Sequence, residues 1–335
     1  MLGLNIFADL ISGTILFAIP LLLVALGGMT SERSGTINIA LEGIMIVGAL
    51  AGCLFLRAMN ASLNGTIPNN PQLIMLAAIL IAAIAGGIFS LLLAFASINL
   101  KADQTIGGTA LNMLAPAFAI VLAWAIQGQG QTTIYIPSWI AIRPENFGLV
   151  ASATPGFWET VIFKSFYLTT PIAFLILIVT TIVYNKTKFG LRLRSCGEHP
   201  QAADSLGINV YKMRYIGVLI SGIFAGIGGL AFTVAAGSGF QSDVAGYGFL
   251  GLAVMIFGNW KPLRIFFAAL FFALFKTLSG LASSIPFLPD FTDIANSQYI
   301  YLMLPYIVTM VVLALTSKSS RAPKAEGIPY DKGLR

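Results

Sequence analysis

The sequence predicts an all-α polytopic membrane protein with about 8–10 transmembrane helices and a short cytoplasmic helix in one loop. Two observations favour this class. Of the 335 residues, 57% are hydrophobic and only 10% are charged, and the mean hydropathy is +0.86. A soluble domain carries about 25% charged residues, far more than this chain. The composition therefore excludes an ordinary soluble enzyme, a disordered protein and a secreted disulfide scaffold.

The second observation is the arrangement of the apolar residues in long runs, since a helix needs about 20 residues to cross a bilayer. Nine candidate crossings are 6–28, 36–57, 72–100, 105–126, 162–185, 214–236, 245–259, 264–284 and 298–316. Gly, Pro and Asn inside several runs predict broken or closely packed helices, and short runs are open to a re-entrant interpretation. No basic residue precedes the first run, so we expect a membrane helix rather than a cleaved signal peptide.

The basic residues predict the orientation. With the N-terminus outside, fifteen of the nineteen Lys and Arg fall in inside loops and in the C-terminal tail. Positive charge accumulates on the cytoplasmic side, so the prediction is N-out and C-in. Residues 1–316 form the transmembrane domain, and residues 317–335 form a cytoplasmic tail. This topology accounts for the net charge of +6. The basic residues lie between apolar runs and do not form a patch of the kind that binds nucleic acid.

The residue types that support catalysis or metal binding are sparse. His199 is the single histidine, and the two cysteines, Cys53 and Cys196, lie in different environments with no metal-binding spacing. We therefore predict no catalytic residues, no metal site and no cofactor in this chain. The sequence also lacks a Gly-x-x-x-x-Gly-Lys-Ser/Thr phosphate loop. Any ATP hydrolysis must therefore occur in another chain.

The loop 186–214 carries the most informative pattern. After a basic stretch, Pro200 suits the first position of a helix, Glu198 suits its positive end, and Gly207 suits a C-terminal cap. The pattern predicts a short helix over about 200–206, outside the bilayer. Its small Ala202–Ala203 face would allow a partner surface to approach closely. The alternative is a solvated connector helix.

Four motifs give the sequence a family resemblance. Residues 197–210 read GEHPQAADSLGINV, and residues 221–230 read SGIFAGIGGL. Both resemble segments of bacterial ABC importer permeases, in the family that includes the ribose and branched-chain amino acid permeases. Residues 31–43, SERSGTINIALEG, and 102–112, ADQTIGGTALN, are most similar to the nucleoside branch, of the guanosine type.

The resemblance implies that the chain forms half of a transmembrane pathway and that the 200–206 helix sits in a cleft of a cytoplasmic ATPase. The implied partners are a second permease, with a heterodimer favoured, ATPase subunits that bind ATP and Mg²⁺, and an extracellular substrate-binding lipoprotein. The residues implied in coupling to the ATPase are Glu198, His199, Pro200, Ala202, Ala203, Asp204 and Gly207.

Three polar residues inside apolar runs are candidates for the substrate pathway: Asn38, Glu42 and Asn112. Asn38 and Glu42 are four residues apart, which predicts that they share a helix face. A carboxylate in a membrane costs several kcal/mol unless it is paired or hydrated. These side chains either bind a polar substrate or hold the structure together. In the second case Glu42 caps a broken helix, and Asn112 bonds to another helix.

The predicted function is the permease subunit of an ABC importer that translocates a nucleoside across the plasma membrane. Alternatives within this class are a simple sugar, riboflavin or another small polar solute. The alternative from another class is an ion-coupled secondary transporter or channel, which would transport its substrate without an ATPase.

Overall fold

The computed structural model describes residues 2–144, 156–164, 166–281 and 321–333, with scattered positions between 303 and 314. Within these ranges the secondary structure is helical, apart from one isolated bridge between Ile134 and Phe240. In the described part of the chain, seven helices are long and apolar enough to cross a membrane. They are α1 (Leu2–Arg33), α2 (Leu41–Ser62), α3 (Pro71–Ala94, extended by η1, Phe95–Asn99), α4 (Gln104–Gln127), α6 (Thr169–Lys186), α9 (Val210–Ala236) and α11 (Pro262–Leu281).

The all-α polytopic prediction is confirmed, although some segments differ in extent. The predicted run 245–259 forms α10 (Tyr247–Phe257), which has 11 residues. At about 1.5 Å per residue it is roughly 16 Å long, about half of the ~30 Å hydrocarbon core. The run 162–185 is divided between α5 (Phe157–Phe163) and α6. Most of the predicted crossing at 298–316 lies outside the described residues.

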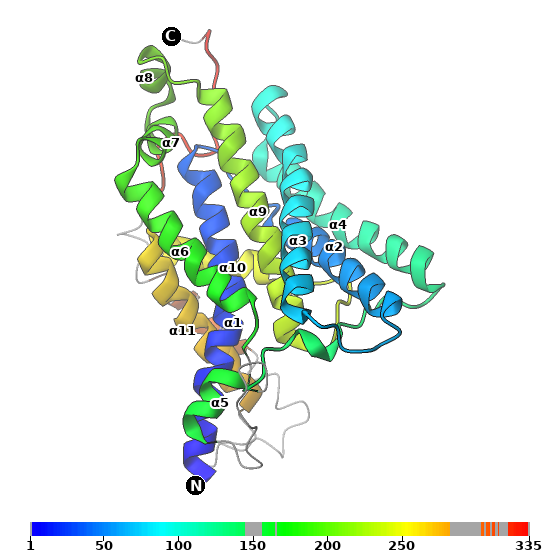
Figure 1. Cartoon of the computed structure of the whole chain (residues 1–335). Coiled ribbons are helices and arrows are strands. Elements are labelled where there is room, and N and C mark those ends of the chain that lie inside the picture. Colours follow the sequence, from blue (N-terminus) through cyan, green and yellow to red (C-terminus); the bar gives the residue numbers. More distant parts are fainter. Residues whose placement is uncertain are drawn as a thin grey trace.

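Helix α9 lies at the centre of the bundle, against α1, α2 and α3, and α1 also packs on α10 and α11 (Figure 1). Glycines make the contacts of α9 close. A Cβ atom at Gly229 would collide with the carbonyl oxygen of Met45 on α2, and one at Gly226 would collide with the carbonyl oxygen of Ala82 on α3. Small residues at helix crossings let two backbones approach closely. In lipid, helices associate mainly through such van der Waals contacts, because the hydrophobic effect does not drive them together there.

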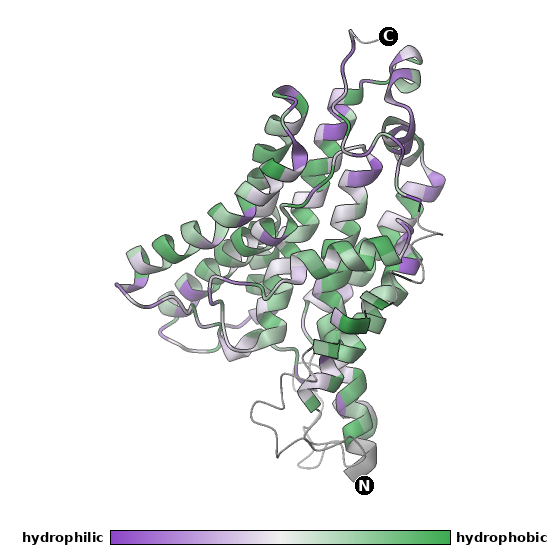
Figure 2. Ribbon diagram, turned by 180° about the vertical axis from the view of Figure 1, so that it is seen from behind, coloured by the Kyte–Doolittle hydropathy of each residue, from purple (hydrophilic) through white to green (hydrophobic). Residues whose placement is uncertain are grey.

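The two ends of the bundle differ. The C-terminus lies at one end with α7 (Lys188–Glu198) and α8 (Pro200–Ser205), and the N-terminus lies at the other end with α5 (Figure 1). Hydrophobic residues run along the long helices, and hydrophilic residues gather near the C-terminus (Figure 2). Helix α4 exposes large apolar side chains such as Met113 and Val121, 73% and 64% exposed. Such a surface suits lipid or another membrane chain.

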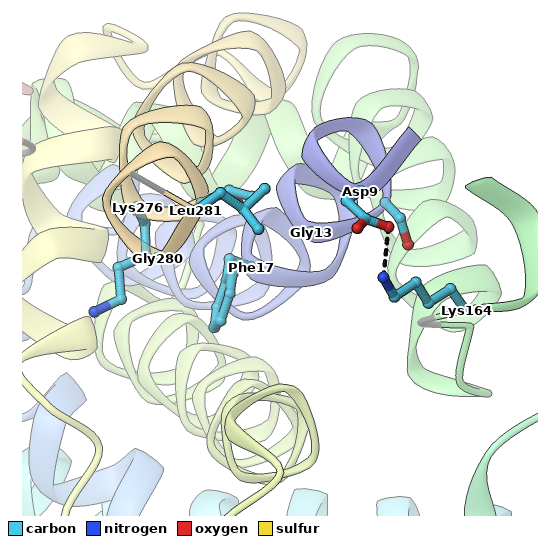
Figure 3. Close-up of a pocket in the computed structure, with 9 residues that line it drawn as sticks. Asp9, Gly13, Phe17, Lys164, Lys276, Gly280 and Leu281 are labelled. Carbon is cyan, nitrogen blue, oxygen red and sulfur yellow. Dashed lines mark hydrogen bonds and ion pairs between the residues drawn. The ribbon is translucent and has the colours of Figure 1, made fainter. Parts of the chain in front are cut away.

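A polar cluster marks the N-terminal end. The Lys164 ammonium contacts the Asp9 carboxylate at 2.5 Å, beside a cavity of about 300 Å³ between α1 and α11. Lys276 on α11 also lines this cavity, and its amine points away from the ion pair (Figure 3). The pair connects the residue after α5 to the first helix. It therefore fixes the position of the short helix at this end.

Candidate functional site

The candidate site surrounds the break between α1 and α2. Residues 34–40 form no regular helix, and Gly35 has a φ of +95°, which favours glycine. The Ser31 hydroxyl donates to the Thr36 carbonyl at 2.7 Å, and the Ser34 hydroxyl donates to the Ser31 carbonyl at 2.6 Å. The first bond gives the Thr36 carbonyl a partner, and the Ser31 carbonyl also accepts from the Ser34 and Thr36 N–H groups. The break lies inside the protein.

Asn38 lies in this break and is fully buried. Its Nδ2 donates to the Ser221 hydroxyl on α9 at 2.8 Å, while its Oδ1 is buried without a hydrogen-bond partner in the described chain. The prediction that Asn38 and Glu42 share a helix face is wrong, because α2 begins only at Leu41. The Asn38 side chain therefore retains one unused acceptor in the core of the bundle.

Glu42 holds the start of α10. Its Oε1 accepts from the Gly246 N–H at 2.8 Å, and its Oε2 accepts from the Gly248 N–H at 2.6 Å. A carboxylate at a helix N-terminus satisfies amides that have no partner within the helix and interacts favourably with the helix dipole. At Gly248 a Cβ atom would overlap the backbone of Glu42, so only glycine permits this approach. The carboxylate thus joins α2 to α10.

Asn112 on α4 joins two further backbone groups. Its Oδ1 accepts from the Gly43 N–H, and its Nδ2 donates to the Ile39 carbonyl, both at 2.8 Å. The side chain thereby bridges the break to the first turn of α2. Both heteroatoms of the Asn112 side chain therefore have a partner, which agrees with the interpretation that Asn112 holds the structure together by bonding to another helix. Within the described ranges, no three His, Cys, Asp or Glu side chains gather into a potential metal site.

The predicted 200–206 helix corresponds to α8, whose first residue is Pro200. Gly207, at a φ of +81°, follows the helix, and its N–H bonds to the Asp204 carbonyl at 2.9 Å. The Ile208 N–H bonds to the Ala203 carbonyl at 3.1 Å. This pair of bonds is a Schellman motif, which satisfies the last carbonyls of a helix. The sequence signals for the start and end of the helix therefore act as predicted.

The predicted small face of α8 is divided between the interior and the surface. Ala203 is 2% exposed and Pro200 is buried, whereas Ala202 is exposed. Leu206, which the sequence analysis missed, is 83% exposed directly after the helix. Of the other candidates, His199 and Gly207 are exposed, and Glu198 and Asp204 are partly buried. A docking partner would therefore meet Ala202 and Leu206 rather than Ala203.

The end of the chain lies against this segment, which sequence analysis missed. The Ala325 N–H donates to the Gly197 carbonyl at 2.8 Å, between α7 and the tail. Arg214 on α9, 1% exposed, donates from Nη1 to the Ile328 carbonyl at 2.9 Å. The Asp331 carboxylate pairs with Lys101 at 2.6 Å, and this hydrogen bond lowers the pKa of Asp331. We name residues 321–333 the C-terminal strap.

Glu326 is a partly buried acid of the C-terminal strap. It lies beside Glu32 at the end of α1, and the Glu32 carboxylate accepts a hydrogen bond from the Trp260 indole N–H at 2.6 Å. Burial raises the pKa of the Glu326 carboxyl, and its hydrogen bond with Glu32 offsets only part of that effect. Glu326 therefore binds a proton more readily where the strap contacts the bundle than it does in water.

Comparisons with known proteins agree with this architecture. Residues 10–313 match the family described as "Branched-chain amino acid transport system / permease component". The guanosine ABC transporter permease protein NupQ of Bacillus subtilis is 42% identical over 99% of both chains. The nucleoside ABC transporter permease protein NupC of Lactococcus lactis is 37% identical over 98% of both chains. NupP, a guanosine ABC transporter permease protein of B. subtilis, is 26% identical over 75% of this chain and 68% of its own. No solved structure matches. The chain belongs to this family of membrane permease components.

Proposed function

We propose that the chain is the permease subunit of an ABC importer that carries nucleosides across the bacterial plasma membrane. One observation carries the proposal: relatives named for guanosine and nucleoside transport match almost the entire chain at 42% and 37% identity. The seven membrane-length helices supply the required multi-pass scaffold. Because the match extends over the whole bundle, it includes the buried break between α1 and α2.

Asn38 is the best candidate in this chain for a substrate contact. Its Oδ1 is a buried acceptor without a partner, and nucleosides carry both N–H and O–H donors. Glu42 and Asn112 have a positioning role in this proposal, because Glu42 is already bonded to the backbone at the start of α10 and Asn112 to the backbone on both sides of Leu41. Transport then requires that α10 and the break move together.

The ATPase would act through α8. We place α7, α8 and the C-terminal strap in the cytoplasm, where partner ATPases bind ATP and Mg²⁺. Ala202 and Leu206 form the exposed docking surface. Gly197 on α7 lies so close to the backbone at Arg33 that a Cβ atom there would collide with it. Movement of α8 would therefore be transmitted to the end of α1 and on to the break.

The remaining partners are a second permease and an extracellular substrate-binding lipoprotein. B. subtilis has two guanosine permease proteins, NupQ and NupP, which supports a heterodimer of unlike permeases here. Sparse polar side chains inside the bundle suit a pathway whose selectivity is set largely by the external lipoprotein.

The proposed substrate is tested by uptake into vesicles that contain the complete complex. Labelled guanosine should accumulate, and excess unlabelled nucleoside should suppress that signal while glucose, ribose and riboflavin leave it unchanged. Absence of guanosine uptake, together with uptake of labelled glucose, ribose or riboflavin by the same vesicles, would assign the alternative substrate.

The proposed coupling surface is tested with Leu206→Asp. We expect loss of ATPase co-purification, because the substitution places a charge on an exposed apolar contact without changing the buried part of α8. The matched control is Ile67→Asp, since Ile67 is 75% exposed in the loop between α2 and α3. Equal co-purification of the ATPase with wild type, Leu206→Asp and Ile67→Asp would exclude Leu206 from the contact.

A further inference from the structure

A basic cavity lies beside the end of α1, apart from the candidate substrate site. It has a volume of about 440 Å³ and is formed by the ends of α1 and α6, by α7, and by the first turn of α11. Four cationic side chains line it: Arg33, Arg194, Lys261 and Arg264. Among the described residues that line it there is no carboxylate. We propose that this cavity binds the phosphate of an anionic phospholipid head group.

No ion pair between described residues joins a carboxylate to the cations that line the cavity. Arg33 donates from Nη2 to the Trp260 carbonyl at 2.8 Å, while its Nε is buried without a hydrogen-bond partner in the described chain. The charge of Arg194 repels that of Arg33, and Glu198 attracts it from outside the cavity. Glu198 and Glu32, which accepts a hydrogen bond from the Trp260 indole, lie outside the lining and together cannot balance four cations. A bound anion would relieve the repulsion and give the buried Nε an acceptor.

The first turn of α11 strengthens the site. The helix begins at Pro262, and Pro262, Leu263 and Arg264 all line the cavity. The positive end of a helix dipole and its free amides favour phosphate. Lys261 and Arg264 are both exposed, so they can follow a mobile head group, while Arg33 and the buried Trp260 form the inner wall.

Apolar stripes below the cavity distinguish a lipid from free phosphate. Helices α6 and α11 lie side by side (Figure 1). On α6, Ile178 and Ile182 are 56% and 53% exposed and lead at helical spacing to Asn185 at the cavity. On α11, Leu263 and Phe267 are 56% and 66% exposed. A phosphate held between these stripes would have surface for acyl chains directly beneath it, as basic pockets between membrane helices provide.

The test measures lipid binding by native mass spectrometry of the purified full-length chain. Phosphatidylglycerol should remain bound at concentrations where phosphatidylcholine does not. The variant Lys261→Gln with Arg264→Gln should bind phosphatidylglycerol about 10- to 30-fold more weakly, because it removes two of the four cations. The single variant Arg264→Gln should show an intermediate loss, which keeps the test valid if the double variant folds poorly.

The matched control is Lys188→Gln with Arg192→Gln, which removes two exposed cations of α7 that do not line the cavity. Wild-type affinity in this control supports the site. An equal loss in both double variants would show general electrostatic attraction and overturn the proposal. Displacement of the lipid by an equal concentration of inorganic phosphate would identify a free-phosphate site and overturn the lipid assignment. Each outcome is independent of the transported substrate.

Discussion

Replacing Glu42 by glutamine tests the bond between α2 and α10. The carboxylate accepts the Gly246 and Gly248 N–H groups at 2.8 and 2.6 Å. A glutamine keeps one acceptor oxygen and turns an NH₂ toward the other amide, so one buried donor is left without a partner. Leaving one buried donor without a partner costs about 1–3 kcal/mol. Glu42→Ala leaves both amides without a partner, so it costs about 2–6 kcal/mol.

The assay is hydrogen exchange at the first turn of α10, under conditions in which exchange reports the opening equilibrium. If the lost hydrogen-bond energy makes local opening of this turn easier, a cost of about 1–3 kcal/mol corresponds to exchange about 5- to 150-fold faster at Gly246 and Gly248 in Glu42→Gln, because RT is about 0.6 kcal/mol. Amides in the middle of α9 should exchange at the wild-type rate.

Glu198→Gln is the control, because it makes the same chemical change at the end of α7. Exchange in the first turn of α10 that is unchanged in both Glu42→Gln and Glu42→Ala would refute the role assigned to Glu42. A gradation from wild type through glutamine to alanine is the expected result.

Three further predictions concern the contacts around this site. Asn112→Ala should lower the free energy of unfolding by about 2–4 kcal/mol, since the buried Gly43 N–H and the half-buried Ile39 carbonyl lose their partner; urea unfolding should show this, and an unchanged midpoint would contradict it. Gly229→Ala should cost about 1–3 kcal/mol, because the new methyl group collides with the Met45 carbonyl; an unaltered apparent Tm would argue against close packing there. The C-terminal strap should dock more weakly as pH rises, because the raised pKa of Glu326 means that the docked strap binds more protons. Its docking is favoured below the ordinary carboxyl pKa and is lost through the raised one. Protease cleavage of the strap should increase with pH more steeply in wild type than in Glu326→Gln, where Glu32 remains beside the strap, and equal pH dependence in both would show that Glu326 does not control docking.

Local signals in the sequence were sufficient for much of the fold. Apolar runs identified the membrane helices, and Pro200 and Gly207 marked the start and end of α8. The runs predicted a gap between residues 28 and 36, whereas α1 continues to Arg33 and α2 begins at Leu41, because the mostly apolar residues 36–40 were assigned to the second crossing. Hydropathy records burial in lipid or protein, not the backbone conformation.

The site was predicted less completely, because its contacts join distant parts of the sequence. Glu42 was identified as an unusual acid in an apolar run, but its partners lie 204 and 206 residues further along the chain. Arg214 was assigned to a loop by its charge, yet it is buried and bonded to Ile328. A single sequence does not show such pairings. Gly248, inside the apolar run predicted at 245–259, is the one local signal of a close contact there, because a Cβ atom at this position would overlap Glu42.

The central claim is that this chain moves nucleosides with energy supplied by other subunits. The most direct test is guanosine uptake into proteoliposomes that contain either the complete complex or this chain with its partner permease alone. We predict uptake only with the complete complex and hydrolysable ATP, and none with an ion gradient alone. Gradient-driven guanosine uptake by the permeases without the ATPase would contradict the account and identify a secondary transporter.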